Sequence, residues 1–264
     1  MFGVMLVAAS FMLNAQTVIF AQNFNASTTL PAGWQSIDRD GNTNDPQFVT
    51  AYGSAIAGWD IDVLSAGNNA ALSTSWYSPV DTSDDWLITP AIAIPANASL
   101  SWKAQSFSAN DLEAYEIRVA LTNTVVGFLA TSPIYTNAAE LSTLTTRTSS
   151  LAAYSGQTVY IAFRNVSIDK LLLVIDDVQV LQLANTDSKI DSSSFPSRYS
   201  SIPLSQRTVF NLSARVNNNG AGTVNNVRVK TEIIELSNNN TIVFNLSLIH
   251  ISEPTRLRRI SYAV

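Results

Sequence analysis

Apolar and polar residues alternate along several segments of the chain with the period of two that is typical of β-strands. The pattern is clearest in residues 100–104, 117–121 and 159–163. Residues 171–175 are apolar without interruption, as expected for a strand that is buried on both faces. No segment sustains the 3.6-residue period of a helix, so the pattern predicts an all-β fold. The alternation places on shared faces Leu100, Trp102, Ala104, Ile117, Val119, Leu121, Val159, Ile161 and Phe163.

The strand pattern divides the chain into two β regions. Residues 17–183 form one unit with frequent Gly, Pro, Asn and Asp turns, for which we expect an antiparallel β-sandwich (jelly roll). Residues 184–205 are rich in Ser, contain two prolines and are predicted to be a linker. A second alternating pattern over 206–245 provides two or three strands, which fits an incomplete immunoglobulin-like β domain.

Both ends of the chain are predicted to lie outside these domains. Residues 1–16 are an apolar stretch that ends near the small residue Ala15, which predicts a secretory signal peptide. An apolar first strand is the alternative, since no Lys or Arg precedes the stretch. Residues 246–256, LSLIHISEPTR, resemble a translated sequencing adapter, so we expect 246–264 to be an artefactual tail; a genuine strand with a basic end is the alternative. No other segment reaches the length of a transmembrane run.

The composition excludes several classes of function. Apolar residues make up 46% of the chain and charged residues 13%, which suits a folded core and not a disordered chain. The net charge of −5 argues against nucleic acid as a partner. The chain has no Cys, and its single His, His250, lies in the expected tail. Nucleophile–His pairs and His-based zinc sites are therefore excluded, and only a carboxylate pair remains for catalysis.

Carboxylates gather in one loop near the N-terminus. Oxygen-bearing side chains recur at short intervals around Gly41, at Asp38, Asp40, Asn42 and Asp45. Oxygen ligands around such a turn suit a hard cation such as Ca²⁺, although no Glu closes the twelve-residue frame of an EF-hand. The alternative is a solvated turn that is rich in Asp and Asn.

A second acidic group, Asp176-Asp177, follows directly on the apolar run 171–175. Adjacent residues of a strand point to opposite faces, so at least one of these carboxylates faces inward or lies at the strand end. A buried carboxylate needs a compensating partner, and we favour Ca²⁺ over a bare surface pair. Solvated loop charge, or an acid–base pair, is the interpretation for Asp84, Asp85, Asp111, Glu113 and Glu116.

The large aromatic residues have two candidate roles, packing in the core and contact with a ligand. The residues predicted to pack in the core are Trp34, Trp86 and Trp102. Trp59, Trp76 and Tyr77 lie in segments rich in Ser, Gly and Asn, and are the candidates for exposed ligand contacts such as stacking on a sugar. Packing is the alternative for each of these three residues.

Five blocks of the sequence carry a family resemblance. They read FNASTTLPAGWQSIDRDG (24–41), DDWLITPAIAIPANASLSWKAQ (84–105), EAYEIRVAL (113–121), YSGQTVYIAFRN (154–165) and VIDDVQV (174–180). In this order they resemble the cleaved-adhesin, or choice-of-anchor J, family of MAM-like jelly rolls, found in gingipain haemagglutinin regions and many secreted bacterial proteins. Residues 206–245 are similar to a CARDB-type immunoglobulin-like domain.

The resemblance implies an exported, calcium-binding jelly roll with an adhesive or substrate-targeting role, often secreted by the type IX route. The acidic features of the family map onto Asp38, Asp40, Glu116, Asp176 and Asp177. Family members often have an acidic residue just before the first Asn-Phe, where this chain has Gln22. If that position is a ligand, the resemblance implies a weaker site in this chain.

We therefore expect a noncatalytic, calcium-stabilised adhesion or binding module of a secreted or cell-surface bacterial protein. Its expected ligands are a host or matrix protein or a glycan. The alternative is an accessory domain of a larger secreted protease or carbohydrate-active enzyme. A further hypothesis is a jelly-roll enzyme that uses Glu113 or Glu116 with an Asp partner in glycoside hydrolysis.

Overall fold

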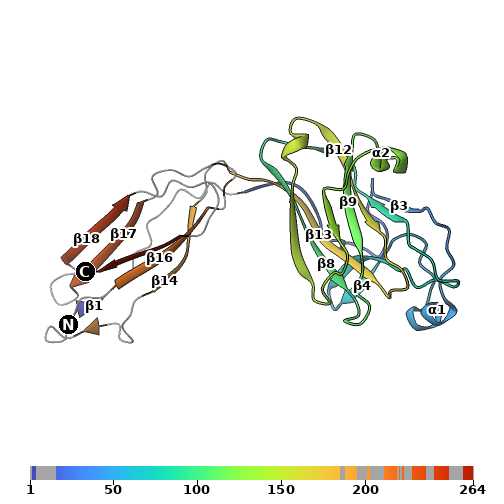
Figure 1. Cartoon of the computed structure of the whole chain (residues 1–264), viewed down its shortest axis with the longest axis horizontal. Helices are drawn as coiled ribbons and strands as arrows, with labels where there is room; N and C mark the ends of the chain where they lie inside the picture. Colours follow the sequence, from blue (N-terminus) through green and yellow to red (C-terminus); the bar gives the residue numbers. More distant parts are fainter. Residues whose placement is uncertain are drawn as a thin grey trace. The chain divides into compact units, whose positions relative to one another are not determined.

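The computed structural model describes residues 16–184 without interruption. Outside this range it describes residues 2–3, 188–194, 201–202, 211–218, 220, 222, 228–235, 241–249 and 258–263. The chain divides into two compact units (Figure 1). One unit runs from Thr17 to Gln182, and the other combines Met1–Gln16 with Leu183–Val264. Each unit is described by itself.

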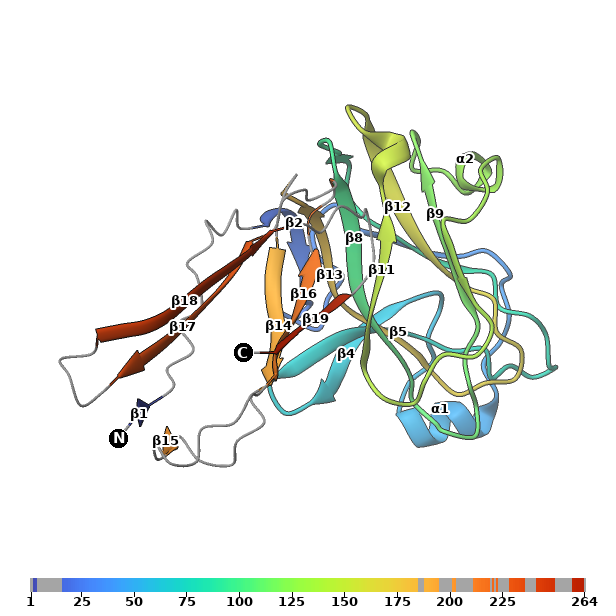
Figure 2. The same ribbon diagram turned by 60° about the vertical axis from the view of Figure 1, so that its left-hand side comes forward.

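The unit from Thr17 to Gln182 is a sandwich of two antiparallel sheets (Figures 1 and 2). The strands of the first sheet are β3 (Gln35–Asp38), β6 (Asp85–Ile88), β7 (Ile92–Ala93), β9 (Tyr115–Ala120), β10 (Tyr135–Asn137) and β12 (Thr158–Asn165). Those of the second are β2 (Thr17–Gln22), β4 (Asp60–Ser65), β5 (Asn68–Ser73), β8 (Ala98–Ser106), β11 (Thr145–Ser150) and β13 (Leu173–Gln182). Their orders are β10-β9-β12-β6-β3, with β7 on β12, and β11-β8-β13-β5-β4, with β2 on β13. The predicted antiparallel sandwich is confirmed.

The predicted alternation accounts for the core between the sheets. Along β8, buried residues alternate with partly exposed ones from Ala98 to Ser106. Trp102 lies at the centre, in an edge-to-face contact with Tyr135 whose ring centroids are 4.9 Å apart. The buried residues of β9 and β12 pack against this face of β8. One position differs from the prediction: Leu121 is 64% exposed, because β9 ends one residue earlier.

The run 171–175 shows why one strand is apolar on both faces. Ile175 faces the core between the sheets, whereas Val174 packs with Phe48 on the outer face of the second sheet. Phe48 belongs to a short helix, α1 (Pro46–Tyr52), which covers that outer face. A second short helix, α2 (Val125–Leu129), covers the outer face of the first sheet in the same way, and Phe128 packs there against Trp86.

Local signals set the limits of α1. Asp45 caps its N-terminus by accepting a hydrogen bond from the backbone N–H of Gln47, and Pro46 occupies the first turn. Gly53, at φ 97°, ends the helix in the left-handed conformation that glycine adopts without strain. A helix of seven residues is too short to produce the sustained 3.6-residue period, so the hydrophobic pattern does not reveal it. A 3₁₀ turn, η1 (Ala152–Tyr154), completes the helical segments of the sandwich.

Strand β13 changes its pairing partner midway. Residues 173–175 pair with β5, and residues 178–182 pair with β2. The register of β13 on β8 slips between Asp176 and Gln179, and Asp177 within the slip has φ 46°. Such a bulge turns one side chain out of the regular alternation, which is why two adjacent aspartates fit at this position.

The described residues of the other unit form two further sheets. Their strands are β1 (Phe2–Gly3), β14 (Ser188–Ser194), β15 (Ser201–Ile202), β16 (Asn211–Asn218), β17 (Arg228–Glu235), β18 (Thr241–Ile249) and β19 (Arg258–Ala263). The sheet orders are β15-β1-β17-β18 and β14-β16-β19. β14 and β15 fall within the segment predicted to be a linker. That prediction rests on the lack of apolar side chains, which backbone pairing does not require.

The expected terminal segments are only partly described. Residues 4–15 of the expected signal peptide and 250–257 of the expected tail lie outside the described residues. β18 crosses the expected boundary at 245/246, and the origin of 246–264 stays a prediction. Within the described part of the chain, no helix has the length and hydropathy needed to cross a membrane.

Candidate metal centre

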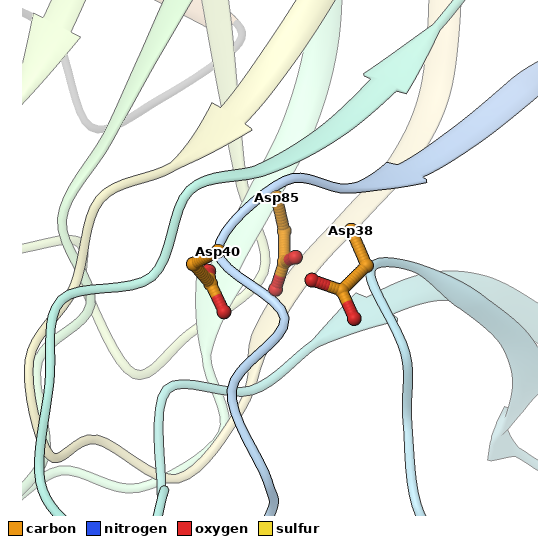
Figure 3. Close-up of side chains that lie close together, drawn as sticks. All are labelled: Asp38, Asp40 and Asp85. Atoms are coloured by element: carbon orange, nitrogen blue, oxygen red, sulfur yellow. The ribbon is translucent and has the colours of Figure 1, made fainter.

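The first sheet places Asp38 and Asp85 side by side. Asp38 is the last residue of β3, Asp85 is the first residue of β6, and the two are direct partners in the antiparallel register. Side chains of such partners lie close together on one face. Asp40 lies in the tight turn that follows, where Gly41 has φ 66°. Carboxylate oxygens of Asp38, Asp40 and Asp85 all lie within 4.8 Å of one another (Figure 3).

Backbone N–H groups fix the two carboxylates of the turn. Gly41 donates to Oδ1 of Asp38 at 2.7 Å, and Asn42 donates to Oδ1 of Asp40 at 2.8 Å. The N–H of Asp84 donates to the other oxygen of Asp40 at 2.5 Å. The turn is therefore tied both to itself and to the residue that precedes β6, and no Lys or Arg of the described residues forms an ion pair with these carboxylates.

Asp85 is the buried member of the group, with 2% of its surface exposed. Its Oδ2 accepts hydrogen bonds from three hydroxyls, those of Tyr77 at 2.9 Å, Ser83 at 3.0 Å and Ser73 at 3.3 Å. Its Oδ1 is also buried but has no hydrogen-bond partner among the described residues. One oxygen of Asp85 is thus hydrogen-bonded to three hydroxyls, and the other has no partner in the part of the chain that the structure describes.

The electrostatics of the group follow from this asymmetry. Burial is the main reason that the pKa of Asp85 rises to about 7, and the charge of Asp40 raises it further. The hydroxyls of Tyr77 and Ser83 act in the opposite direction. Close carboxylates of like charge disfavour ionisation unless a cation compensates them. The centre therefore favours either a proton or a bound cation.

The ligand set suits a hard divalent cation. All three side chains offer carboxylate oxygens, which Ca²⁺ and Mg²⁺ prefer, and no sulfur or imidazole ligand is present. Ca²⁺ tolerates irregular geometry and accepts backbone carbonyls and waters as further ligands, which suits a turn next to a strand end. The buried, unpartnered Oδ1 of Asp85 fits such an ion. Within the described residues, this is the one group of three His, Cys, Asp or Glu side chains whose ligand atoms converge in this way.

The other two residues of the predicted loop have different roles in the structure. Asp45 caps α1 and lies outside the converging group. The side-chain nitrogen of Asn42 donates to the carbonyl of Thr82 at 3.4 Å, which ties the loop to the segment before β6. The structure thus brings together two residues of the predicted loop, Asp38 and Asp40, and adds Asp85 from the neighbouring strand. Metal binding by any of the four loop residues stays a prediction.

Asp176 and Asp177 have partners within the protein. Asp176 is 1% exposed, as the sequence predicts for one of the pair, and accepts hydrogen bonds from the side chain of Asn68 at 3.0 Å and from the N–H of Asp177 at 2.7 Å. Burial raises its pKa. Asp177 forms an ion pair with Lys103 at 2.7 Å. The structure does not bring these two aspartates to the acidic centre, and their compensation comes from an amide and an ammonium group.

Glu116 is surrounded by positive charge. It accepts bonds from Arg118 at 2.6 Å and Arg164 at 2.8 Å, and these guanidinium groups lower its pKa although burial opposes them. Arg164 also binds Asp84 and lies over the ring of Trp86 at 5.0 Å from its centroid. Two guanidinium groups on one carboxylate repel a further cation, so the structure does not support Glu116 as a metal ligand.

The sequence of the sandwich matches a known family. Residues 17–180 match the family model described as Cleaved Adhesin Domain, which covers more than half of the chain. The chain belongs to the Cleaved Adhesin family. Hemagglutinin A of Porphyromonas gingivalis is 29% identical to it in an alignment 188 residues long, and the match covers 62% of this chain and 7% of that protein. The chain spans 7–8% of the length of the two curated relatives that it matches.

Solved structures of cleaved-adhesin domains are similar to the same part of the chain. The K1 domain of Lys-gingipain from Porphyromonas gingivalis W83 is 22% identical, with a TM-score of 0.47, over 63% of this chain and 98% of that domain. The K3 domain of the same protein is 22% identical, with a TM-score of 0.46, over 63% of this chain and 99% of that domain. The family consists of noncatalytic adhesin domains, which agrees with the expectation that this chain has no catalytic residues.

Two of the three proposed ligand-contact aromatics of the cleaved-adhesin domain are buried. Trp59 is 4% exposed and Tyr77 is 3% exposed, so the prediction that they form an exposed platform is wrong. Trp59 packs in the core between the sheets, and Tyr77 instead directs its hydroxyl to Asp85. Trp76 is partly exposed and packs against Phe48 of α1, so a contact with a ligand stays a prediction for Trp76 alone.

Glu113 was one of two candidates for an acid–base pair. It is fully buried, and neither carboxylate oxygen accepts a hydrogen bond from a described residue. Burial raises its pKa to about 8, although Ser167 and Lys170 oppose that rise. A fully buried group offers no access to a substrate, and Glu116 is occupied by arginines. Neither Glu113 nor Glu116 is therefore placed to act in the hydrolytic pair of the enzyme hypothesis.

Asp85 is the member of the acidic centre that the sequence does not predict. In the sequence it is only one half of Asp84-Asp85, and it forms the first residue of a strand of four residues. Its partnership with Asp38 depends on which strands are neighbours, and that information is not local. The available signal was the start of the strand: in β6 the alternating side chains place Asp85 and Leu87 on the face that is buried between the sheets.

Proposed function

We propose that this cleaved-adhesin domain is a noncatalytic binding module that is stabilised by Ca²⁺ at Asp38, Asp40 and Asp85. The calcium ion would supply a positive charge and oxygen coordination, and no chemical step. The module would belong to a larger secreted or cell-surface protein. Support for an adhesive role comes from the family of residues 17–180 and from the similarity to Hemagglutinin A.

One observation carries the calcium proposal. Asp85 is 2% exposed, its Oδ2 accepts three hydroxyl hydrogen bonds, and its Oδ1 has no partner among the described residues. A buried carboxylate oxygen without a partner is strongly unfavourable. Carboxylate oxygens of Asp38 and Asp40 lie within 4.8 Å of an oxygen of Asp85 and add negative charge. A bound divalent cation removes both problems at once.

Thermal melting of the full chain tests the metal. With Ca²⁺ at 100 times Kd, the folded state gains about 2.7 kcal/mol. For a domain of this size that raises the melting midpoint by about 5–10 °C relative to a chelator. Asp85→Asn should abolish the difference, whereas the same substitution at the exposed Asp81, four residues earlier, should retain it. An unchanged midpoint of the wild-type chain in Ca²⁺ and in chelator contradicts the proposal.

Binding measurements test the adhesive role. We expect the labelled full chain to bind erythrocytes, a matrix-protein array or a glycan array in Ca²⁺, and to bind less after chelation because the module is then less stable. A protein ligand and a glycan ligand are distinguished by which array retains the chain. Absence of saturable binding to cells and to both arrays would contradict the adhesive role and leave the calcium result intact.

A further inference from the structure

A buried polar relay lies behind the acidic centre and joins the two sheets. Asn165, the last residue of β12, is the direct register partner of Asp85 in β6. Ser73, the last residue of β5, comes from the opposite sheet and contacts both of them. Asn165 and Ser73 are fully buried, so no exposed group competes for these contacts.

The direction of each hydrogen bond in this relay is fixed. The backbone N–H of Ser167 donates to Oδ1 of Asn165 at 2.9 Å, so the amide oxygen of Asn165 faces Ser167. The amide nitrogen must then face Ser73, to whose hydroxyl oxygen it donates at 3.1 Å. The single hydroxyl proton of Ser73 is directed to Oδ2 of Asp85, 3.3 Å away.

The relay decides which oxygen of Asp85 remains free. With Oδ2 held by Ser73, Tyr77 and Ser83, the carboxylate cannot rotate without breaking three hydrogen bonds, so Oδ1 remains the oxygen without a partner among the described residues. Tyr77 and Ser83 contact Asp85 directly from neighbouring segments of the chain. Ser73 is the one donor of the three that comes from the second sheet, and its orientation is set by Asn165.

We propose that Asn165 is a positioning residue of the calcium centre, which acts through the hydroxyl of Ser73 on Asp85; this rests on the proposed function. An asparagine is required because the side chain must accept from Ser167 on one side and donate to Ser73 on the other. The relay also ties calcium binding to the packing of the two sheets, since the ligand is in one sheet and its hydroxyl donor is in the other. Groups that orient a metal ligand from behind contribute strongly to affinity.

Calcium titration of full-chain variants by calorimetry, well below the melting midpoint of each metal-free variant, tests the relay. Asn165→Ala should weaken Ca²⁺ binding by about 10- to 100-fold. Ser73→Ala, which removes a single hydroxyl, should weaken it by a similar factor. Because both act on Asp85 along one path, the double variant should bind no more weakly than the weaker single variant. The control Asn137→Ala removes an asparagine amide that donates to Glu140 and should leave Kd unchanged.

The outcomes separate this proposal from the one on which it rests. A wild-type chain that does not bind Ca²⁺ overturns both. A wild-type chain that binds, together with Asn165→Ala and Ser73→Ala variants of unchanged Kd, overturns the positioning role alone. Additive losses in the double variant also overturn it, because they show independent structural effects. If Asn165→Ala does not fold, the Kd of Ser73→Ala alone decides: an unchanged value overturns the relay.

Discussion

Asp38 and Asp85 in the first sheet, and Asp176 and Asp177 in the second, all place carboxylates at the margin of the core, but their surroundings differ. Asp176 receives an amide and a backbone N–H, and Asp177 receives an ammonium group. No Lys or Arg pairs with Asp38, Asp40 or Asp85 within the described residues. The nearby guanidinium groups of Arg39 and Arg164 bind Asp84 instead. A ligand site is therefore indicated by charge that the chain leaves uncompensated, and not by the adjacency of two aspartates.

Glu113 extends this comparison, because neither of its carboxylate oxygens accepts a hydrogen bond from a described residue and it belongs to no group of converging carboxylates there. Its folded pKa of about 8 is above its ordinary value of 4.5, so its contribution to stability is complete at low pH and is lost as the pH rises through about 8. Between pH 5 and 9 this loss is on the order of 4 kcal/mol. Glu113→Gln should flatten the decline and make the chain more stable than wild type at pH 9.

Denaturant unfolding of the full chain at pH 5, 7 and 9 measures this effect. Asp81→Asn, which removes the charge of an exposed carboxylate, is the control and should keep the wild-type slope. If the free energy of unfolding declined with pH equally in wild type and in Glu113→Gln, the protonation of Glu113 would not be the cause of the decline.

The second test exchanges one carboxylate in each region. Asp38→Asn should remove the Ca²⁺-dependent stabilisation, about 2.7 kcal/mol at 100 times Kd, because it removes one of three converging ligands. Asp177→Asn removes the same charge from the internally compensated pair and should leave the calcium increment intact. Melting of both variants in Ca²⁺ and in chelator checks the pair. A calcium increment that is lost in Asp177→Asn and kept in Asp38→Asn would reverse the assignment.

The smallest effect is expected at Lys103. Its ammonium group pairs with Asp177 at 2.7 Å, with the two side chains 40% and 33% exposed. Solvent screens such a pair, so Lys103→Gln should cost roughly 0.2–1 kcal/mol. The cost should shrink further in 1 M NaCl. Chemical denaturation at low and high salt measures this cost. A loss above about 2 kcal/mol would mean that Lys103 and Asp177 behave as a buried ion pair and not as a solvent-screened one.

The sequence predicts the sandwich well, because its signal is local. The alternation of Leu100, Trp102 and Ala104 translates directly into burial between the sheets. The apolar run 171–175 likewise predicts a strand covered on both faces, and the acidic pair after it predicts a buried Asp176. In each case the backbone period alone determines which way a side chain points.

The acidic centre was only half visible, because its completion is a matter of topology. The loop of Asp38 and Asp40 can be recognised from spacing, but Asp85 joins it only through the β3–β6 register. The prediction that Trp59 and Tyr77 are exposed is wrong for a related reason. Ser, Gly and Asn around Trp59 and Tyr77 indicate turns, but turns here lie against other segments, such as the bridge between Asn44 and Tyr77, and bury the rings.

The pairing of β2 with the second half of β13 has a mechanical consequence. The first residue of β2, Thr17, is opposite the last residue of β13, Gln182, so the chain enters and leaves the sandwich at neighbouring points. Ends that meet in this way allow a domain to be inserted into a longer chain. A pull on the two flanking segments would open this antiparallel pair from its end, one hydrogen bond at a time, rather than shear all of them together. Under tension, the edge formed by β2 would therefore be the first part of the sandwich to separate.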